Sequence, residues 1–459
     1  MARVAIVGGG IAGLSAAYEL TQRKIPFILY EASTRLGGII ETTREEGFVM
    51  ECGPDGWVSE KPWARELCIE LGLEEDLIPS NDTERVTYVL RDGTLHAIPS
   101  GMRMMVPTDL EALRESKLFS PSAIAAYEQE PQRAQELKDY AESHMAEDES
   151  VASFVRRHFG EEVTRTIAAP LLAGVFGGDV ERLSAQSVMP QFLAMERTHG
   201  SLILGLRERS RPDAKAIFTT LRSGLGTLID AMTSALPEES IRLQSCVDKI
   251  EREGDFWKIC AGDASETFDA IFLATPVHRT RSLLASVDAE AAQLLAIGAS
   301  SAVIVGFGFN AEQAKSFSVP QGFGFLVPPG EEGSDLLAAT FSDQKYAGRV
   351  PEDGRALRAF FGGNAGERLQ GESDGWLIAL AKKQLGDVLG CELPDAALTI
   401  VRRWPLSLPQ YEVGHADRMR RLNERLNVLP GLTLLGNAYR GVGLPDLIRD
   451  GREAARQIS

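Results

Sequence analysis

A glycine-rich turn near the N-terminus constrains this chain more than any other feature of its sequence. Residues 3–8, RVAIVG, are predicted as a short buried strand, and residues 11–20, IAGLSAAYEL, as a helix of small and apolar residues. The turn between them carries Gly8, Gly10 and Gly13 in the spacing G-x-G-x-x-G. In a βαβ unit the first glycine permits the tight turn, the second lets a pyrophosphate approach the backbone, and the third lets helix and strand pack closely. The chain therefore begins with a predicted dinucleotide-binding unit.

The second strand of this unit, FILY at 27–30, is followed directly by an acidic residue, Glu31. A carboxylate at this position can accept a hydrogen bond from a ribose hydroxyl, which fits either NAD or the ADP half of FAD. The residues of this unit that we expect to contact the nucleotide are Gly8, Gly9, Gly10, Ile11, Ala12, Gly13, Glu31 and Ala32.

Length and composition limit the other partners. With 459 residues the chain is too long for one simple core, so two or three domains are expected. The net charge of −17 argues against a nucleic-acid partner, because phosphate binding needs a basic face. Five scattered cysteines without a C-x-x-C pair, and six histidines without ligand spacing, predict no metal site and a reducing compartment. A charged run at 128–149 is expected to be the solvated face of a helix.

Hydrophobic periodicity predicts that nucleotide-binding pieces alternate with other structure. A hairpin is expected around Asp92 and Gly93, residues 108–200 should be mostly helical, and strands return at 215–285 and 300–365. Residues 376–390 form a predicted amphipathic helix closed by Gly390. The apolar runs are about half the roughly 20 residues needed to span a bilayer, so we expect a cytoplasmic protein.

The loop after Glu31 favours FAD over NAD. Residues 31–38 read EASTRLGG, and Arg35, Gly37 and Gly38 in this stretch resemble the flavin amine oxidase superfamily. The resemblance implies that this loop lines the FAD pyrophosphate and the isoalloxazine ring.

Three later segments agree with FAD. By the same resemblance, Val247, which we expect on a strand, holds the adenine through backbone groups, and Ala274 in FLATP lies in a second nucleotide-side turn. The glycine loop GVGLPD at 441–446 precedes a helix whose positive end can face the flavin. FAD is therefore the predicted cofactor.

Four further stretches make the resemblance specific. GPDGW at 53–57, AGVFGGD at 173–179, GSLILGL at 200–206 and PQYEVGH at 409–415 resemble the porphyrinogen oxidases of haem biosynthesis, especially the Bacillus-type enzymes. The resemblance implies an α/β fold, with a Rossmann-like FAD-binding domain of the flavin monoamine oxidase type, an inserted mixed-sheet substrate domain and a mostly helical insert. The expected ranges are 1–85, 206–285 and 411–459 for the FAD-binding domain, 86–205 for the helical insert, and 286–410 for the substrate-binding domain.

The same resemblance assigns residues to the site. The expected flavin contacts are Gly53, Pro54, Asp55, Gly56, Trp404, Val442, Gly443 and Leu444. The expected substrate contacts are Arg103 on a propionate, the Gly174 carbonyl on the macrocycle, Leu326 and Phe360 on its faces, and Thr340, where plant-type enzymes have leucine. Lys345 and Arg349 are expected to be surface charges and His415 to be structural, and no side chain is assigned as a catalytic acid or base.

The implied reaction is a six-electron oxidation of coproporphyrinogen III or protoporphyrinogen IX by molecular oxygen, with hydrogen peroxide as by-product. The sequence leaves the choice between the two porphyrinogens open. It also leaves room for two further partners, the next enzyme of the haem pathway and a membrane surface beneath residues 108–200. The alternatives are another flavin oxidase of the superfamily, such as an amine oxidase or carotenoid desaturase, and a carrier protein of the same fold without flavin.

Overall fold

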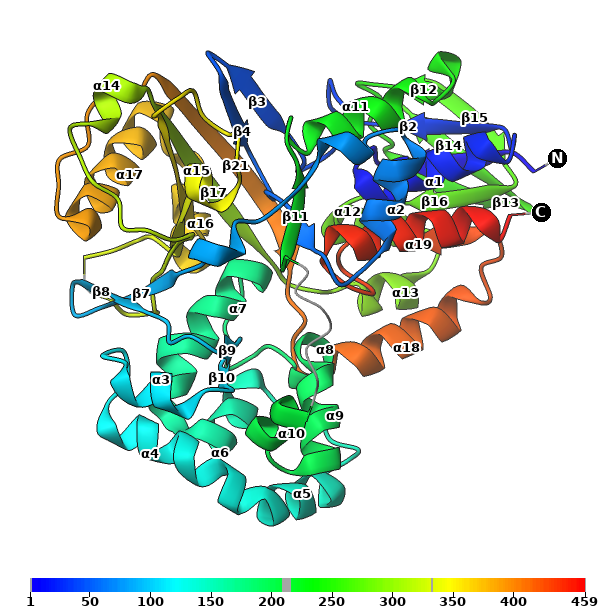
Figure 1. The fold of residues 1–459 in the computed structure, drawn as a ribbon. Helices are drawn as coiled ribbons and strands as arrows, with labels where there is room; N and C mark the ends of the chain where they lie inside the picture. The colour runs from blue at the N-terminus through cyan, green and yellow to red at the C-terminus, as the bar shows by residue number, and fades with distance from the viewer. Residues whose placement is uncertain (1, 209–215, 332, 459) are drawn as a thin grey trace.

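A five-stranded parallel sheet forms the centre of the nucleotide-binding lobe in the computed structural model, which describes residues 2–208, 216–331 and 333–458 (Figure 1). Its strands, in spatial order, are β12 (Ile241–Arg242), β2 (Phe27–Tyr30), β1 (Val4–Val7), β16 (Ala270–Leu273) and β22 (Leu432–Leu434). Every neighbouring pair is parallel, and the strands come from the start, middle and end of the chain. The lobe is therefore complete only when the C-terminal segment is in place.

Both faces of this sheet are covered, as a parallel sheet requires. On one face lie the helices α1 (Ile11–Gln22), α2 (Trp63–Glu70), α11 (Gly226–Ser234) and α19 (Leu444–Arg456). On the other lie α12 (Val277–Leu284), α13 (Ala289–Leu294), α18 (His415–Leu426) and the antiparallel strands β13 (Lys249–Glu253), β14 (Phe256–Ala261) and β15 (Ala264–Phe268).

A second, seven-stranded sheet forms the neighbouring lobe. Its strands, in spatial order, are β21 (Leu398–Pro409), β17 (Ala299–Phe309), β20 (Arg355–Phe361), β19 (Ala338–Phe341), β18 (Gly324–Leu326), β7 (Thr87–Arg91) and β8 (Thr94–Ala97). One face packs on α17 (Asp374–Leu389), which ends at Gly390 in a left-handed conformation as predicted. The predicted hairpin at Asp92 is also present, but it forms the edge of this sheet, whereas the expected ranges placed it in the helical insert.

The remaining lobe is helical, as predicted for residues 108–200, and lies below the two sheets in Figure 1. Its helices are α3 (Leu110–Glu115), α4 (Pro121–Gln129), α5 (Ala134–Ser143), α6 (Val151–Val163), α7 (Ala169–Phe176), α8 (Ala185–Val188), α9 (Pro190–His199) and α10 (Leu202–Glu208). None of the helices in the described part of the chain is long and apolar enough to cross a membrane.

The other short elements lie within the lobes or between them. They include β3 (Thr42–Glu45), β4 (Phe48–Glu51), β5 (Trp57–Val58), β6 (Leu77–Pro79), β9 (Met102–Arg103), β10 (Val106–Pro107), β11 (Phe218–Leu221), α14 (Ala311–Ala314), α15 (Ser342–Lys345) and α16 (Gly363–Arg368). All five cysteines are free.

A buried charged cluster holds the helical lobe together, and the expectation that residues 128–149 are only a solvated helix face is wrong at Glu130. The Glu130 side chain is fully buried and lies 2.9 Å from His158 Nδ1, while His158 Nε2 lies 3.1 Å from Glu196. Arg157 also binds Glu196, at 2.9 Å. Burial opposes ionisation of Glu196, but the hydrogen bond and charge of His158 and the charge of Arg157 outweigh it and lower the pKa of this carboxyl. The two ring nitrogens of His158 thus join a carboxyl group of α9 to one that precedes α5.

This cluster predicts a large loss of stability on removal of its central side chain. The substitution His158→Ala leaves the buried Glu130 and Glu196 side chains without their shared partner, so we expect the free energy of unfolding to fall by about 3 kcal/mol. Urea unfolding followed by circular dichroism measures this change. The matched control is His144→Ala, because His144 is exposed at the end of α5, and there we expect a change within about 0.5 kcal/mol. Equal losses in the two variants would contradict the assignment.

Candidate functional site

The first βα turn is shaped by three glycines that meet different surroundings. Gly8 has a φ of 110°, and a Cβ there would overlap the carbonyl of Ala274. A Cβ at Gly13 would overlap the carbonyl of Gly8, so this residue sets the close approach of helix to strand. A Cβ at Gly10 would meet no protein atom within 4 Å. The turn is therefore closed on the side of the protein and open at Gly10, where a ligand backbone contact is predicted.

Glu31 is held beside this turn. Its carboxylate accepts hydrogen bonds from the N–H groups of Gly9 and Ser33, each at 2.8 Å. Both bonds come from the backbone, so the carboxylate has a fixed position at the carboxyl end of β2, where the sequence predicts a ribose contact. Ala32, the next predicted residue, is exposed.

The loop that the sequence linked to FAD lies directly against the same turn. The N–H of Gly37 donates to the carbonyl of Gly9 at 2.8 Å, and a Cβ on Gly38 would lie 3.2 Å from Gly10. The Arg35 guanidinium donates to the carbonyls of residues 36, 38 and 40 and to Glu41. Arg35 therefore braces its own loop, and its contact with the cofactor stays a prediction.

Both helices predicted to face the cofactor begin without a side-chain cap. Helix α1 starts after Gly10 and has no acidic residue in its first turn, and α19 starts after Gly443. Free N–H groups and the helix dipole at such a start favour a phosphate or another anionic group. In α19 the first-turn acid Asp446 is buried and accepts a 2.5 Å contact from Lys61, a residue that the sequence did not single out. The donors present fit the pyrophosphate of a dinucleotide.

Val247 does not lie on a strand, so that expectation is wrong. It lies in the connection between β12 and β13, and its side chain is buried in the cluster that contains Tyr30. The chain leaves β12 here to cross the end of β2, where the N–H of Ser245 donates to the Glu31 carbonyl at 2.9 Å. The segment is therefore beside the predicted ribose contact, and an adenine contact for Val247 stays a prediction.

Residues 53–56 link the nucleotide-binding lobe to the second sheet. A Cβ on Gly53 would overlap the carbonyl of Ile39, which follows the loop described above. From the sheet side, the indole N–H of Trp404 donates to the Cys52 carbonyl at 2.7 Å, and Arg358 donates to the Gly53 carbonyl. The four residues predicted to line the flavin, namely Gly53, Pro54, Asp55 and Gly56, are all partly exposed.

Two charges expected at the surface are buried in this region, and that expectation is wrong. The Lys345 side chain is 12% exposed and lies 2.9 Å from Asp55, and the Arg349 side chain is 2% exposed and lies 3.1 Å from Glu51. Burial opposes ionisation of Asp55, but the charges of Lys345 and Arg358 outweigh it and lower the pKa of this carboxyl. Each cation is buried because a carboxylate from a distant part of the chain pairs with it.

The three predicted substrate contacts in the second sheet share one face. The register pairs Leu326 with Ala338 and Ala338 with Phe360, and it pairs Thr340 with Arg358. Neighbouring residues such as Phe325, Phe341 and Phe361 point to the opposite face and pack in the cluster with α17. Leu326, Thr340 and Phe360 are partly exposed, so they form an accessible, mainly apolar wall next to Arg358.

The other two predicted substrate contacts come from the helical lobe. Arg103 lies on β9, and its guanidinium has no hydrogen bond or ion pair within residues 2–208, 216–331 and 333–458. Gly174 is exposed on α7, and a Cβ there would meet no atom within 4 Å, so close helix packing does not explain this glycine. Helix α7 contacts β18, which carries Leu326.

The two sequence blocks that carried the family resemblance contact each other. The Gln410 side chain donates to the Phe176 carbonyl at 2.8 Å, and a Cβ on Gly178 would overlap the Gln410 side chain. The Tyr411 hydroxyl donates to the Asn437 carbonyl at 2.7 Å and accepts from the N–H of Gly441 at 3.2 Å. These blocks therefore tie the helical lobe to the glycine loop before α19.

His415 stacks on the Tyr411 ring at 4.0 Å. Burial lowers the pKa of His415 to about 4, so its ring is neutral near pH 7 and serves packing. Within the described residues, no group of three or more His, Cys, Asp or Glu side chains is arranged to hold a metal ion.

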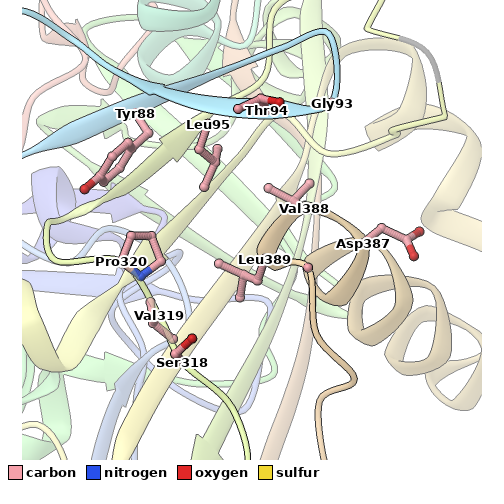
Figure 2. Close-up of a pocket in the computed structure, with 11 residues that line it drawn as sticks. Tyr88, Gly93, Thr94, Leu95, Ser318, Val319, Pro320, Asp387, Val388 and Leu389 are labelled. Atoms are coloured by element: carbon pink, nitrogen blue, oxygen red, sulfur yellow. The ribbon is translucent and has the colours of Figure 1, made fainter.

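A groove of about 510 Å³ lies elsewhere, between the β7–β8 hairpin and the C-terminal end of α17 (Figure 2). Tyr88, Leu95, Val388 and Leu389 line it and belong to the α17 side of the sheet. None of the predicted site residues lines this groove.

The sequence did not indicate Arg358 as a site residue, and it predicted an exposed position for Lys345. Arg358 is the one charge in the apolar stretch ALRAFFGG at 356–363, and a single charge in such a strand is a signal of a buried partner. Lys345 carries no comparable local signal, because its partner Asp55 lies 290 positions away along the chain.

A Rossmann-type lobe with two uncapped helix starts, packed beside a mixed sheet, is the architecture of a dinucleotide-binding protein. The family model described as flavin containing amine oxidoreductase matches residues 11–459. The chain belongs to this family, and it is an FAD-dependent oxidoreductase.

Known relatives span the whole chain. A coproporphyrinogen III oxidase of Bacillus subtilis is 32% identical over 98% of this chain and 96% of its own length. A human protoporphyrinogen oxidase is 30% identical over 99% of this chain and 98% of its own length. A crystal structure assigned as a protoporphyrinogen oxidase of Exiguobacterium superposes with a TM-score of 0.85 at 31% identity. The match covers 99% of this chain and 98% of the Exiguobacterium chain. A Brevibacterium cyclohexylamine oxidase, at 17% identity and a TM-score of 0.70, shares the fold.

The glycine turn generates a paired prediction. Gly10 has a φ of −70° and open space at its Cβ, so Gly10→Val should fold normally but block the pyrophosphate and lose bound FAD. Gly13→Val should lose both the native fold and the bound FAD, because the valine side chain would overlap the Gly8 carbonyl. Circular dichroism measures the fold and visible absorbance measures the flavin. Retention of FAD by a folded Gly10→Val protein would contradict this placement.

Proposed function

We propose that this chain catalyses the FAD-dependent oxidation of a porphyrinogen in haem biosynthesis, with coproporphyrinogen III and protoporphyrinogen IX as the candidate substrates. The observation that carries the proposal is the full-length similarity to enzymes named for these two reactions. Three bacterial relatives named coproporphyrinogen III oxidase are 29–32% identical over 98–99% of this chain. The amine oxidases support only a shared fold, because the similar structures are 15–17% identical.

The proposed binding site lies on the sheet face that carries Leu326, Thr340 and Phe360. A flat, largely apolar macrocycle suits a mainly apolar wall, because burial of its faces removes apolar surface from water. By the family resemblance, Thr340 stands where plant-type enzymes have leucine, and its hydroxyl is buried without a hydrogen-bond partner among the described residues. When bound, FAD supplies the two-electron redox chemistry, and the protein supplies binding and orientation.

Arg103 is the proposed anchor for a propionate. Its guanidinium makes no hydrogen bond or ion pair with another described residue, and an arginine–carboxylate contact is strong and directional. A propionate held at one point fixes the rotation of the macrocycle in its own plane. The contact therefore selects which edge of the macrocycle approaches the cofactor. We assign no side chain as catalytic acid or base.

We also propose molecular oxygen as the electron acceptor, with hydrogen peroxide as the product. The family resemblance supports this acceptor, and it also supports delivery of the porphyrin to the next enzyme of the pathway. Contact of the helical lobe with a membrane surface is a further proposal, based on the resemblance alone.

Substrate choice is decided by initial rates. The purified protein with bound FAD should convert at least one of the two porphyrinogens to its fluorescent porphyrin and consume oxygen with it. Benzylamine and putrescine should give no turnover. Flavin-loaded protein that leaves both porphyrinogens unchanged would overturn the proposed function.

Arg103 generates a separate kinetic prediction. Removal of a charge-assisted hydrogen bond costs about 1.5–3 kcal/mol, so Arg103→Met should raise KM for the porphyrinogen by roughly 10- to 100-fold. The value of kcat should change little, because the residue binds a peripheral group. Arg114→Met is the matched control, since Arg114 pairs with Glu128 on the outside of the helical lobe. A fall in kcat with unchanged KM would contradict the anchoring role.

A further inference from the structure

We propose that Lys345, Asp55 and Arg358 set the reduction potential of the bound flavin through a buried excess of positive charge. The proposal rests on the proposed placement of residues 53–56 against the flavin ring. It assigns a role to charges that lie outside the dinucleotide turn and outside the apolar wall.

The three side chains form one contact group. Lys345 Nζ lies 2.9 and 3.0 Å from the two carboxylate oxygens of Asp55, so it meets both of them. Arg358 lies 3.4 Å from Asp55 and also donates to the Gly53 carbonyl. Asp55 is thus held between two cations that come from α15 and β20 of the second sheet lobe.

The neighbouring charges leave a net positive balance. Arg349 pairs with Glu51 at 3.1 Å and donates to Thr220 and to the Leu221 carbonyl. The buried group therefore has three cations, Lys345, Arg349 and Arg358, against two carboxylates, Asp55 and Glu51. The side chains of all five are no more than 18% exposed. Charges with so little water around them interact more strongly than surface charges.

One donor of this group and one hydroxyl beside it have no hydrogen-bond partner among the described residues. Arg358 Nε and the hydroxyl of Tyr346 are buried, and neither has a hydrogen bond within the described residues. Arg358 lies over the Phe360 ring at 4.8 Å, and a Cβ on Gly56 would overlap the Tyr346 hydroxyl. The group therefore reaches both the predicted flavin loop and the predicted substrate wall.

This position explains the proposed effect. Reduction adds electrons to a flavin ring, and nearby positive charge stabilises the reduced form, whereas nearby negative charge disfavours it. Lys345 and Arg358 should raise the potential, and Asp55 should lower it. If these residues only held the loop in place, substitution of Lys345 and of Asp55 would shift the flavin potential in the same direction.

The test compares two variants of opposite charge change. Lys345→Met should shift the equilibrium between oxidised and reduced bound flavin about tenfold toward the oxidised form, a fall of about 30 mV for a two-electron couple. Asp55→Asn should shift it in the opposite direction by a similar amount. Reductive titration of the purified flavoprotein against reference dyes measures both midpoint potentials.

Two controls separate charge from structure. Lys345→Arg keeps the charge and should restore most of the potential. Arg355→Met should leave the potential unchanged, because Arg355 lies on the same strand as Arg358 but pairs with Asp343 at 2.8 Å.

Shifts of the same sign in Lys345→Met and Asp55→Asn, unchanged potentials in both, or loss of bound FAD from either variant would overturn the proposal. Porphyrinogen turnover by the unaltered protein is measured separately. Opposite potential shifts without any turnover would overturn the proposed function and leave this assignment standing.

Discussion

Direct contact between backbone segments at the first βα turn positions the loops that are predicted to hold the cofactor. Gly13 packs against Gly8, and the loop at Gly37 bonds back to Gly9. That loop continues to Ile39, whose carbonyl touches Gly53. Main-chain groups make each of these steps, so side-chain rotamer changes cannot loosen the path. Trp404 and Arg358 of the second sheet bind the carbonyls of Cys52 and Gly53, so this series of contacts fixes the predicted cofactor loops relative to the predicted substrate wall.

Local backbone chemistry made much of the fold predictable. The glycine turn, the hairpin at Asp92 and the helix end at Gly390 each depend on residues that favour one conformation. The features that the sequence did not predict depend on residues that are distant from each other along the chain. Burial of Lys345 needs Asp55, and the edge position of the β7–β8 hairpin needs β18. Among the site residues, the shared face of Leu326 and Phe360 follows from strand register, which single strands do not specify.

The sequence blocks at 173–179 and 409–415 suggested a family but gave no physical reason for their composition. The structure supplies one, because Gly178 leaves room for Gln410 and the Tyr411 hydroxyl bridges to the loop before α19. The helical lobe and the predicted flavin loop are thus fixed to each other through a few residues. A side chain at position 178 would displace Gln410, so the residues of each block limit what the other block can contain.

The order of strands in the parallel sheet has a consequence for synthesis on the ribosome. Strand β16 borders β1 on one side and β22 on the other, and β22 lies close to the C-terminus. Until that segment leaves the ribosome, β16 presents an unpaired edge, and helix α19 cannot cover α1. Pairings over such long sequence separations form slowly, and exposed strand edges favour aggregation. The nucleotide-binding lobe therefore cannot close around its central sheet until the last residues of the chain have been made.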